Sequence, residues 1–189
     1  MISMAKPEPH EGRKKKILEA FRRRFAHFGQ KKTSVDEVAS ELGMSKKTIY
    51  SLFPSKEKIF YSIVYEIASR KKGEIKRQLS KIKNPKKKLL FLADMAFKHR
   101  RKKCHSCAFD IEFKEEIASL AVRHAYDDLL TEIVQDAMDK GQIEKMNAQV
   151  LVSALRAVVL EGAKLYASEE NPKDIRLGVH KIILKMLKK

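Results

Sequence analysis

The sequence predicts an all-α fold of about nine helices. The 189 residues include only 7 Gly and 5 Pro, and aromatic residues make up 7% of the chain. Alternation of apolar and polar residues over strand-length windows is hard to find, which argues against sandwiches and barrels. Apolar residues recur instead at helical spacing, and a hydrophobic content of 43% is enough for one or two small domains.

The net charge of +17 is concentrated in the first half of the chain. Basic and acidic residues number 14 and 7 over residues 1–58, 15 and 3 over 59–103, and 12 and 14 over 104–189. Because lysine–phosphate contacts release counterions, this asymmetry indicates a polyanionic partner, either nucleic acid or an anionic membrane surface. No uncharged apolar stretch of about 18 residues occurs, and the start lacks the apolar segment of a signal peptide. We therefore expect a cytoplasmic protein that does not enter a membrane.

The first helix is expected from about Arg13 to Phe28. Residues 1–11 contain two prolines and little apolar material, so they are expected to be a disordered lead-in. Gly29 follows the helix as a stop signal. The apolar residues at helical spacing within it are Ile17, Phe21, Phe25 and Phe28.

Two short helices follow, joined by the turn Gly43-Met44-Ser45. Ser34 and Glu37 have the spacing of a capping box, in which side chain and backbone satisfy each other's hydrogen bonds. The first short helix therefore begins after Ser34 and ends at Gly43. The second begins after Ser45 and is closed by Pro54.

Longer helices are expected after Pro54. Asn84-Pro85 and Asn171-Pro172 each combine a capping residue with a proline at the first helical position, and Gly141 ends a long helix. The stretch 147–167 is apolar nearly all round and must be covered on both sides. With 172–187, it is expected to form a four-helix homodimer interface. The expected ranges are 55–82, 84–103, 105–113, 114–140, 147–167 and 172–187.

The paired short helices form a helix-turn-helix pattern, in which the second helix enters the DNA major groove. The residues of this pattern and its flanks are Thr33-Ser34-Val35, Val38-Ala39, Leu42-Gly43-Met44-Ser45-Lys46-Lys47-Thr48-Ile49-Tyr50 and Phe53-Pro54-Ser55-Lys56-Glu57. They resemble the DNA-binding domain of the TetR family of transcriptional regulators. The likeness is close over residues 13–60 and most specific over 43–57, but Lys47 stands where many members have Gly and Leu52 where Tyr or His is frequent.

The resemblance implies a dimeric repressor that binds a palindromic operator in double-stranded DNA and is released by a small molecule. It divides the chain into a DNA-binding domain over residues 12–54 and a ligand-binding and dimerisation domain over residues 55–189. Beyond about Phe60 the likeness is one of layout only. The ligand is expected to be partly apolar and is not identified by the sequence.

The expected DNA contacts lie on both short helices. Lys46 and Lys47 stand at the N-terminus of the second helix, where cationic side chains and the helix end both favour phosphates or guanine edges. A solvated face is the alternative interpretation of these lysines. The resemblance adds residues that match family positions near DNA. The full set is Thr33, Ser34, Ser45, Lys46, Lys47, Thr48, Tyr50 and Lys56.

Two further clusters have more than one interpretation. Basic residues at Lys98 and 100–103 add non-specific attraction to DNA or remain in water at a helix C-terminus. The resemblance also suggests an apolar ligand cavity. Apolar residues at helical spacing are, however, more often part of the hydrophobic core than the lining of a cavity. Its candidate lining residues are Phe91, Met95, Phe109, Phe113, Ile117, Leu120 and His124.

The segment Cys104-His105-Ser106-Cys107 leaves a second regulatory mechanism open. A lone C-x-x-C is weak evidence for zinc, so a structural role is favoured, with metal or redox sensing through Cys104, His105 and Cys107 as the alternative. We expect no cofactor and no metal. A non-specific architectural protein would explain the charge but not the apolar helix over 147–167. An enzyme is not expected, because Gly-rich phosphate loops, Gly-x-Ser-x-Gly elbows and paired carboxylates are missing from the sequence.

Overall fold

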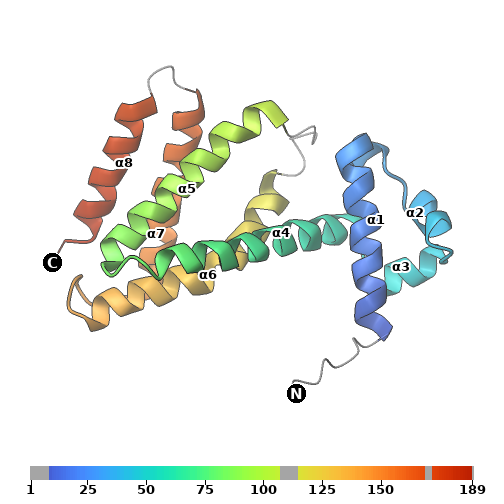
Figure 1. Cartoon of the computed structure of the whole chain (residues 1–189), viewed down its shortest axis with the longest axis horizontal. Coiled ribbons are helices and arrows are strands. Elements are labelled where there is room, and N and C mark those ends of the chain that lie inside the picture. Colours follow the sequence, from blue (N-terminus) through green and yellow to red (C-terminus); the bar gives the residue numbers. More distant parts are fainter. Residues whose placement is uncertain (1–8, 107–114, 169–171, 189) are drawn as a thin grey trace. The chain divides into compact units, whose positions relative to one another are not determined.

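The computed structural model describes residues 9–106, 115–168 and 172–188. Within these ranges the chain forms eight α-helices and no strand, which confirms the all-α prediction (Figure 1). The helices are α1 (Pro9–Lys32), α2 (Val35–Glu41), α3 (Lys46–Leu52), α4 (Lys56–Leu79), α5 (Pro85–Ser106), α6 (Glu115–Asp139), α7 (Ala148–Ser168) and α8 (Pro172–Met186).

Two sequence expectations need correction. The ninth helix was expected over residues 105–113, but residues 105 and 106 are the end of α5 and residues 107–113 lie outside the described residues. The lead-in was expected over residues 1–11, but α1 already begins at Pro9. Proline suits the first position of a helix, because its missing N–H would have no partner there. Residues 1–8 lie outside the described residues.

The chain divides into two compact units. Unit 1 comprises Met1–Arg70 and Ala108–Ala125, and unit 2 comprises Lys71–Cys107 and Tyr126–Lys189. Unit 1 therefore extends beyond the domain boundary expected at residue 54. The reason is that Ile59, Phe60 and Ile63 of α4 are buried in the N-terminal core.

The core of unit 1 joins α1 to the two short helices and to α4. The rings of Phe21 and Phe25 on α1 lie 5.4 Å apart, and Phe25 meets the ring of Phe60 on α4 at 6.1 Å. Ile49 brings α3 into the same core, where its side chain is fully buried. The helical stripe predicted for α1 therefore becomes core, except at Phe28, whose side chain is exposed.

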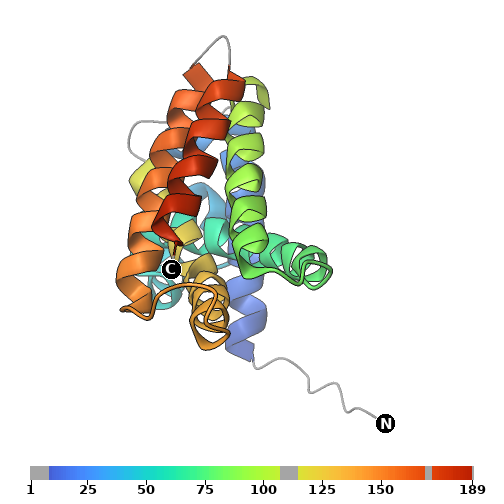
Figure 2. The ribbon, with the colours of Figure 1, turned by 90° about the vertical axis from the view of Figure 1, so that its left-hand side faces the viewer.

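The core of unit 2 takes buried side chains from α4, α5, α6, α7 and α8. Within it, α5, α7 and α8 lie side by side (Figures 1 and 2). Phe97 of α5 is buried and its ring stacks on that of Tyr166 in α7, with 5.2 Å between centroids. Asp94 of α5 accepts hydrogen bonds from Arg176 and lies 2.9 Å from His180, both on α8. Apolar packing and a polar cluster thus hold the three helices together.

The helix α7 is apolar on more than one side, as the sequence predicted. Leu151 and Leu155 are buried in the core of unit 2, whereas Val150 is 64% exposed and Leu160 and Leu165 are also exposed. The described part of the chain thus leaves one face of α7 uncovered. None of the described helices has the length and apolar character needed to cross a bilayer.

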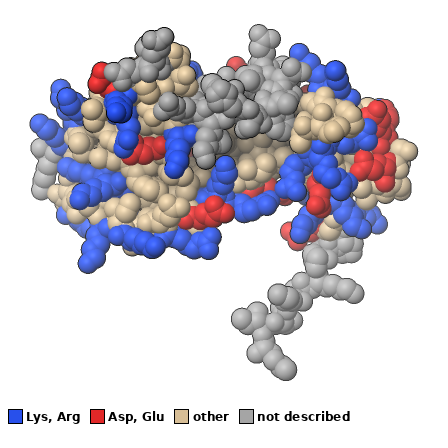
Figure 3. All heavy atoms as spheres, turned by 45° about the horizontal axis from the view of Figure 1, so that its top comes forward, with Lys and Arg blue, Asp and Glu red and all other residues tan. Residues whose placement is uncertain are grey.

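Basic side chains dominate the charged surface. In the face drawn in Figure 3, lysine and arginine side chains outnumber and often separate the acidic ones. This is the surface expected of a chain with 41 basic and 24 acidic residues.

Candidate DNA-binding surface

The first short helix, α2, is held at its N-terminus by the predicted capping box. The hydroxyl of Ser34 accepts a hydrogen bond from the backbone N–H of Asp36 at 3.1 Å. The carboxylate of Glu37 accepts one in return from the backbone N–H of Ser34 at 3.3 Å. Both bonds use amides that would otherwise lack a partner at the helix end, so they fix where α2 begins.

The turn between α2 and α3 depends on Gly43. Its backbone adopts φ +61°, a left-handed conformation that is costly for residues with a Cβ. The N–H of Met44 then reaches the carbonyl of Ala39 at 2.9 Å, and that of Gly43 reaches Ser40 at 3.2 Å. This is the hydrogen-bond pattern of a Schellman motif, which ends α2 and redirects the chain.

The start of α3 is fixed by Ser45. Its hydroxyl accepts a hydrogen bond from the backbone N–H of Thr48 at 3.1 Å and lies 2.9 Å from the hydroxyl of Thr48. Because Ser45 and Thr48 are engaged with each other, they stiffen the first turn of α3. Both hydroxyls remain close to the surface that carries the neighbouring lysines.

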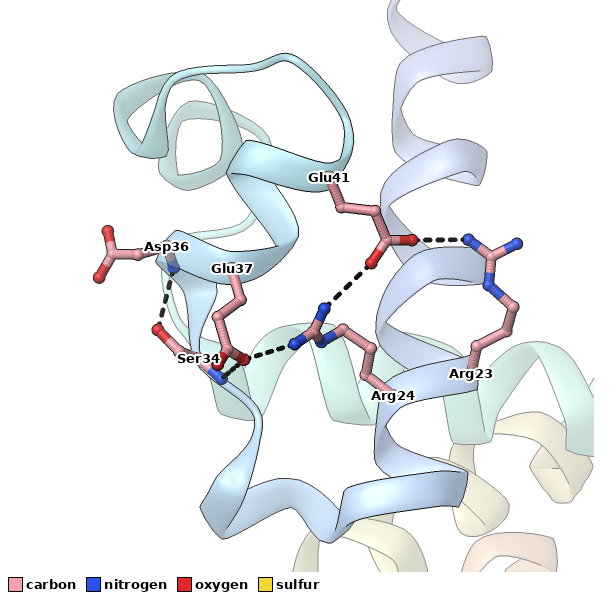
Figure 4. A network of polar contacts seen from close by, with 6 residues as sticks. All are labelled: Arg23, Arg24, Ser34, Asp36, Glu37 and Glu41. Atoms are coloured by element: carbon pink, nitrogen blue, oxygen red, sulfur yellow. Dashed lines mark hydrogen bonds and ion pairs between the residues drawn. The ribbon is translucent and has the colours of Figure 1, made fainter.

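An arginine–glutamate network ties α2 to α1 (Figure 4). The guanidinium of Arg24 bonds Glu37 at 2.6 Å and Glu41 at 3.2 Å, and Arg23 bonds Glu41 at 2.8 Å. The hydrogen bond from Arg24 lowers the pKa of Glu41, and the same bond raises the pKa of Arg24. Two carboxylates on α2 thus face two guanidinium groups on α1.

The outer face of α3 carries the residues predicted to contact DNA. Lys46, Lys47 and Tyr50 are exposed, whereas Ile49 between them is buried in the core of unit 1. The ammonium group of Lys46 bonds the carboxylate of Asp36 on α2 at 2.9 Å, and this bond raises the pKa of Lys46. The structure therefore brings the lysines, Thr48 and Tyr50 together on one short helix.

Three other predicted contacts are placed differently. Thr33 is only 1% exposed, and its hydroxyl donates a hydrogen bond to the carbonyl of Gly29 at 2.8 Å. Ser34 is half-buried and engaged in capping α2. Lys56 is half-buried at the start of α4, where burial lowers its pKa. The hydroxyl of Thr33 therefore has a structural partner within its own chain.

Sequence reasoning missed the acidic side chains of this surface. Asp36 was not singled out although it faces Lys46, and Glu37 was assigned only to the capping box although it also binds Arg24. The sequence offered one signal, since Asp36, Glu37 and Glu41 are the acidic residues of an otherwise basic segment. Each of them is paired with a cation.

The candidate ligand-lining residues fall in different parts of the chain. Phe91 and Met95 are half-buried against the core of unit 2, whereas Ile117 packs against the core of unit 1. Leu120 is 39% exposed, and Nδ1 of His124 lies 2.6 Å from the hydroxyl of Tyr61. Phe109 and Phe113 lie outside the described residues.

The structure does not describe the side chains of the cysteine segment. Cys104 and His105 lie in the last turns of α5, and Cys107 lies outside the described residues. Among the residues whose side chains are described, no three His, Cys, Asp or Glu residues gather as metal ligands would.

The helix-turn-helix segment is similar to a family of known proteins. Residues 17–63 match the family described as bacterial regulatory proteins, tetR family. A stretch of 51 residues is 47% identical to YhgD, a helix-turn-helix-type transcriptional regulator of Bacillus subtilis (strain 168). That stretch spans 27% of this chain and 27% of YhgD, about a quarter of each.

Solved structures resemble the chain over nearly its whole length. RolR in complex with resorcinol superposes with a TM-score of 0.70 at 12% identity, over 94% of this chain and 88% of RolR. The fatty acid degradation regulator FadR of Bacillus halodurans gives 0.60 at 19% identity, over 92% and 99%. FadR of Bacillus subtilis with stearoyl-CoA gives 0.54 at 16% identity, over 92% and 97%. At such identities the likeness establishes the fold alone.

Proposed function

We propose that this protein, whose helix-turn-helix segment belongs to the TetR family of bacterial regulatory proteins, is a transcriptional regulator that binds duplex DNA through α3. The observation that carries the proposal is the outer face of α3. Lys46, Lys47 and Tyr50 are exposed there on a helix whose opposite face is anchored by Ile49. A short helix with a buried inner face and a cationic outer face suits the major groove.

We further propose that two copies bind a palindromic operator. The uncovered apolar side chains of α7 and α8, among them Val150, Leu160, Leu177 and Leu184, support an interface between copies of this chain. A two-fold dimer would present its two α3 helices to successive major grooves, about 34–36 Å or a little more apart. Operator symmetry would then mirror the symmetry of the protein.

The regulatory signal in this proposal is a partly apolar small molecule. Phe91 and Met95, half-buried beside the core of unit 2, are the described candidates for contacting it. The relatives RolR and FadR of Bacillus subtilis were solved with resorcinol and stearoyl-CoA, which supports an organic ligand for this chain too. Ligand would favour a dimer whose α3 helices no longer match the operator spacing, so it would lower the affinity for the operator. Bound operator must then lower the affinity for the ligand by the same factor.

Selection of duplexes from a random library tests the DNA-binding part. We expect enrichment of one palindrome, and Lys46→Ala with Tyr50→Ala should abolish its binding without altering the melting temperature. Lys145→Ala, an exposed lysine on the loop between α6 and α7, serves as the matched control. Failure to enrich any sequence, or unchanged affinity of the α3 variant, would contradict the proposal.

Native mass spectrometry of the purified protein tests the dimer and the ligand together. A mass of twice 21.8 kDa plus an organic adduct is the expected result and would help to identify the ligand. A metal-sized adduct would support the alternative in which Cys104, His105 and Cys107 sense a metal. A monomer would contradict the proposed dimer.

A further inference from the structure

A second basic surface lies in unit 2, around the turn that joins α4 to α5. We call residues 71–88 the basic turn, since they include nine basic residues and one acidic residue, Glu74. Figure 3 shows many blue side chains at the left-hand end of the view, where Figure 1 draws this turn beside the ends of α6 and α8. Elsewhere in unit 2, residues 126–189 carry 10 basic and 10 acidic residues, and the remaining excess lies in the cluster at Lys98 and 100–103. The basic turn therefore holds most of the excess positive charge of the unit.

Most of these cations have no acidic partner within the described part of the chain. Lys72 binds Asp128 at 2.9 Å, and Lys76 binds Glu132 at 3.1 Å. No ion pair among the described residues involves the other seven, of which several are exposed. These seven are Lys71, Arg77, Lys81, Lys83, Lys86, Lys87 and Lys88.

The lysines at the start of α5 are not placed to stabilise their own helix. Lys86, Lys87 and Lys88 lie in its first turn, which contains no acidic residue. The helix dipole disfavours cations at this end and favours anions. Asn84 supplies the local cap by accepting a hydrogen bond from the N–H of Lys87 at 3.2 Å. An external anion would satisfy both the helix end and the lysines.

The side-chain composition of the basic turn selects among polyanions. It has no aromatic residue, and Ile75 and Leu79 are buried in the core. A surface that enters a membrane interface uses exposed apolar anchors, and one that binds single strands uses aromatic rings for stacking. Eight lysines and one arginine are suited to phosphates as point charges and less to reading base edges.

We infer that the basic turn is a second, sequence-independent binding surface for duplex DNA, separate from the helix-turn-helix. It contacts the phosphate backbone through unpaired lysines on both sides of the α4–α5 turn. The inference does not rest on operator recognition by α3, because the basic turn and α3 belong to different units.

The test uses two matched triple variants of the full-length protein. Lys81, Lys83 and Lys87 of the basic turn are changed to Gln in one, and Lys145, Lys173 and Lys188 elsewhere in unit 2 are changed to Gln in the other. All six side chains are exposed. Binding to a random-sequence duplex of about 30 base pairs is measured between about 50 and 200 mM KCl. Both proteins also carry Lys46→Gln and Lys47→Gln, which neutralise α3.

We expect the basic-turn variant to lose at least about tenfold in duplex affinity at low salt. The slope of log affinity against log salt should become shallower by about 2 to 3, since each lost phosphate contact contributes about 0.9. The control triple should change neither quantity by as much. Changing the three basic-turn lysines to Arg should preserve binding, which separates loss of charge from loss of folding.

Three outcomes would overturn the inference. Equal effects of the two triples would show that only net charge matters. Tighter binding to single strands than to the duplex would show another nucleic-acid partner. Basic-turn-dependent binding to vesicles containing anionic phosphatidylglycerol, without such binding to duplex, would show a membrane partner. The two proposals can also fail separately. If no palindrome were enriched from the random library but the basic-turn variant still gave a shallower salt slope, only the proposed regulatory function would be contradicted.

Discussion

Glu41 links α2 to α1, because it accepts hydrogen bonds from both Arg23 and Arg24. These bonds lower its pKa from the ordinary value of 4.5. A carboxylate with a lowered folded-state pKa stabilises the protein above the unfolded-state pKa. That contribution is lost as the pH falls through the folded-state value.

We therefore predict that Glu41→Gln lowers the melting temperature by about 2–4 °C at pH 7, a modest effect because the pair is partly exposed. The difference from the unmodified protein should shrink once the pH falls below about 4.5. Thermal unfolding monitored by circular dichroism from pH 7 to pH 3 measures it. Glu144→Gln, at an exposed glutamate without an ion pair among the described residues, should have no such effect. If the difference in melting temperature between Glu41→Gln and the unmodified protein stayed constant from pH 7 to pH 3, the stabilising role of the ionised Glu41 carboxylate would be contradicted.

Thr33 has a hydrogen-bond partner that the sequence did not predict. The sequence placed it one position before the N-cap of α2, where family likeness suggested a DNA contact. The backbone break at Gly29, with φ +77°, leaves the carbonyl of that residue open to a side chain four positions later. The hydroxyl of Thr33 takes this place and is buried. Such a partner depends on a local backbone break that residue type alone does not specify.

At the scale of helices, the Asp36–Lys46 pair links the two halves of the helix-turn-helix. The carboxylate on α2 holds the ammonium group of Lys46 on the face proposed to meet DNA. A phosphate that binds Lys46 must displace this carboxylate and lies close to its negative charge. Asp36 should therefore lower the affinity of the protein for DNA.

We predict that Asp36→Asn tightens binding of a random-sequence duplex by about two- to fivefold, the range expected for an exposed ion pair. Fluorescence anisotropy at low salt measures this change. Asp174→Asn, which removes an exposed carboxylate from the first turn of α8, is the control for net charge. An Asp36→Asn variant that binds more weakly, or no better than the control, would contradict this role.

The α7–α8 contact depends on a glycine. A Cβ at Gly162 of α7 would collide with a methyl group of Val179 on α8. We predict that Gly162→Ala destabilises unit 2 by about 1–3 kcal/mol through overpacking. Adding Val179→Ala should recover part of this loss. The four proteins of the double-mutant cycle are compared by urea unfolding.

Gly73 provides the matched control for that cycle. It lies within α4, and a Cβ at this position would meet no atom within 4 Å. Gly73→Ala should therefore raise stability by about 0.5–1 kcal/mol, since alanine is the better helix former. If Gly162→Ala were equally favourable, the close approach of α7 and α8 would be disproved.

Most helix ends could be predicted because their signals are local. Ser34, Gly43 and Pro54 act on backbone groups within a few residues, and α2 and α3 begin and end where those residues indicate. The division into units could not be predicted in this way. It depends on which helices share a core, and α4 contributes side chains to both cores. The network of Arg23 and Arg24 with α2 was missed for the same reason.

At the scale of the whole molecule, α7 and α8 carry more apolar side chains than the described part of the chain covers. Leu177 is 57% exposed and Leu184 is exposed on the same helix, seven residues apart, so both lie on one face. Exposed leucines at helical spacing on adjacent helices are typical of an interface between subunits. The sequence predicted an interface over 147–167 and 172–187, since a helix apolar on both sides needs a second partner.

We predict that Leu177→Glu with Leu184→Glu converts the protein from a dimer to a monomer of 21.8 kDa. Two carboxylates per subunit would be buried against their symmetry mates, and the apolar contact of both leucines would be lost as well, so both effects oppose association. Light scattering coupled to size-exclusion chromatography measures the mass. Leu120→Glu, an exposed leucine on α6, is the control and should leave a dimer. The monomer should still bind duplex DNA. Its affinity for a duplex with two half-sites should, however, exceed that for a duplex with one by no more than the twofold expected from the number of sites. A charged variant that remains dimeric would place the interface elsewhere.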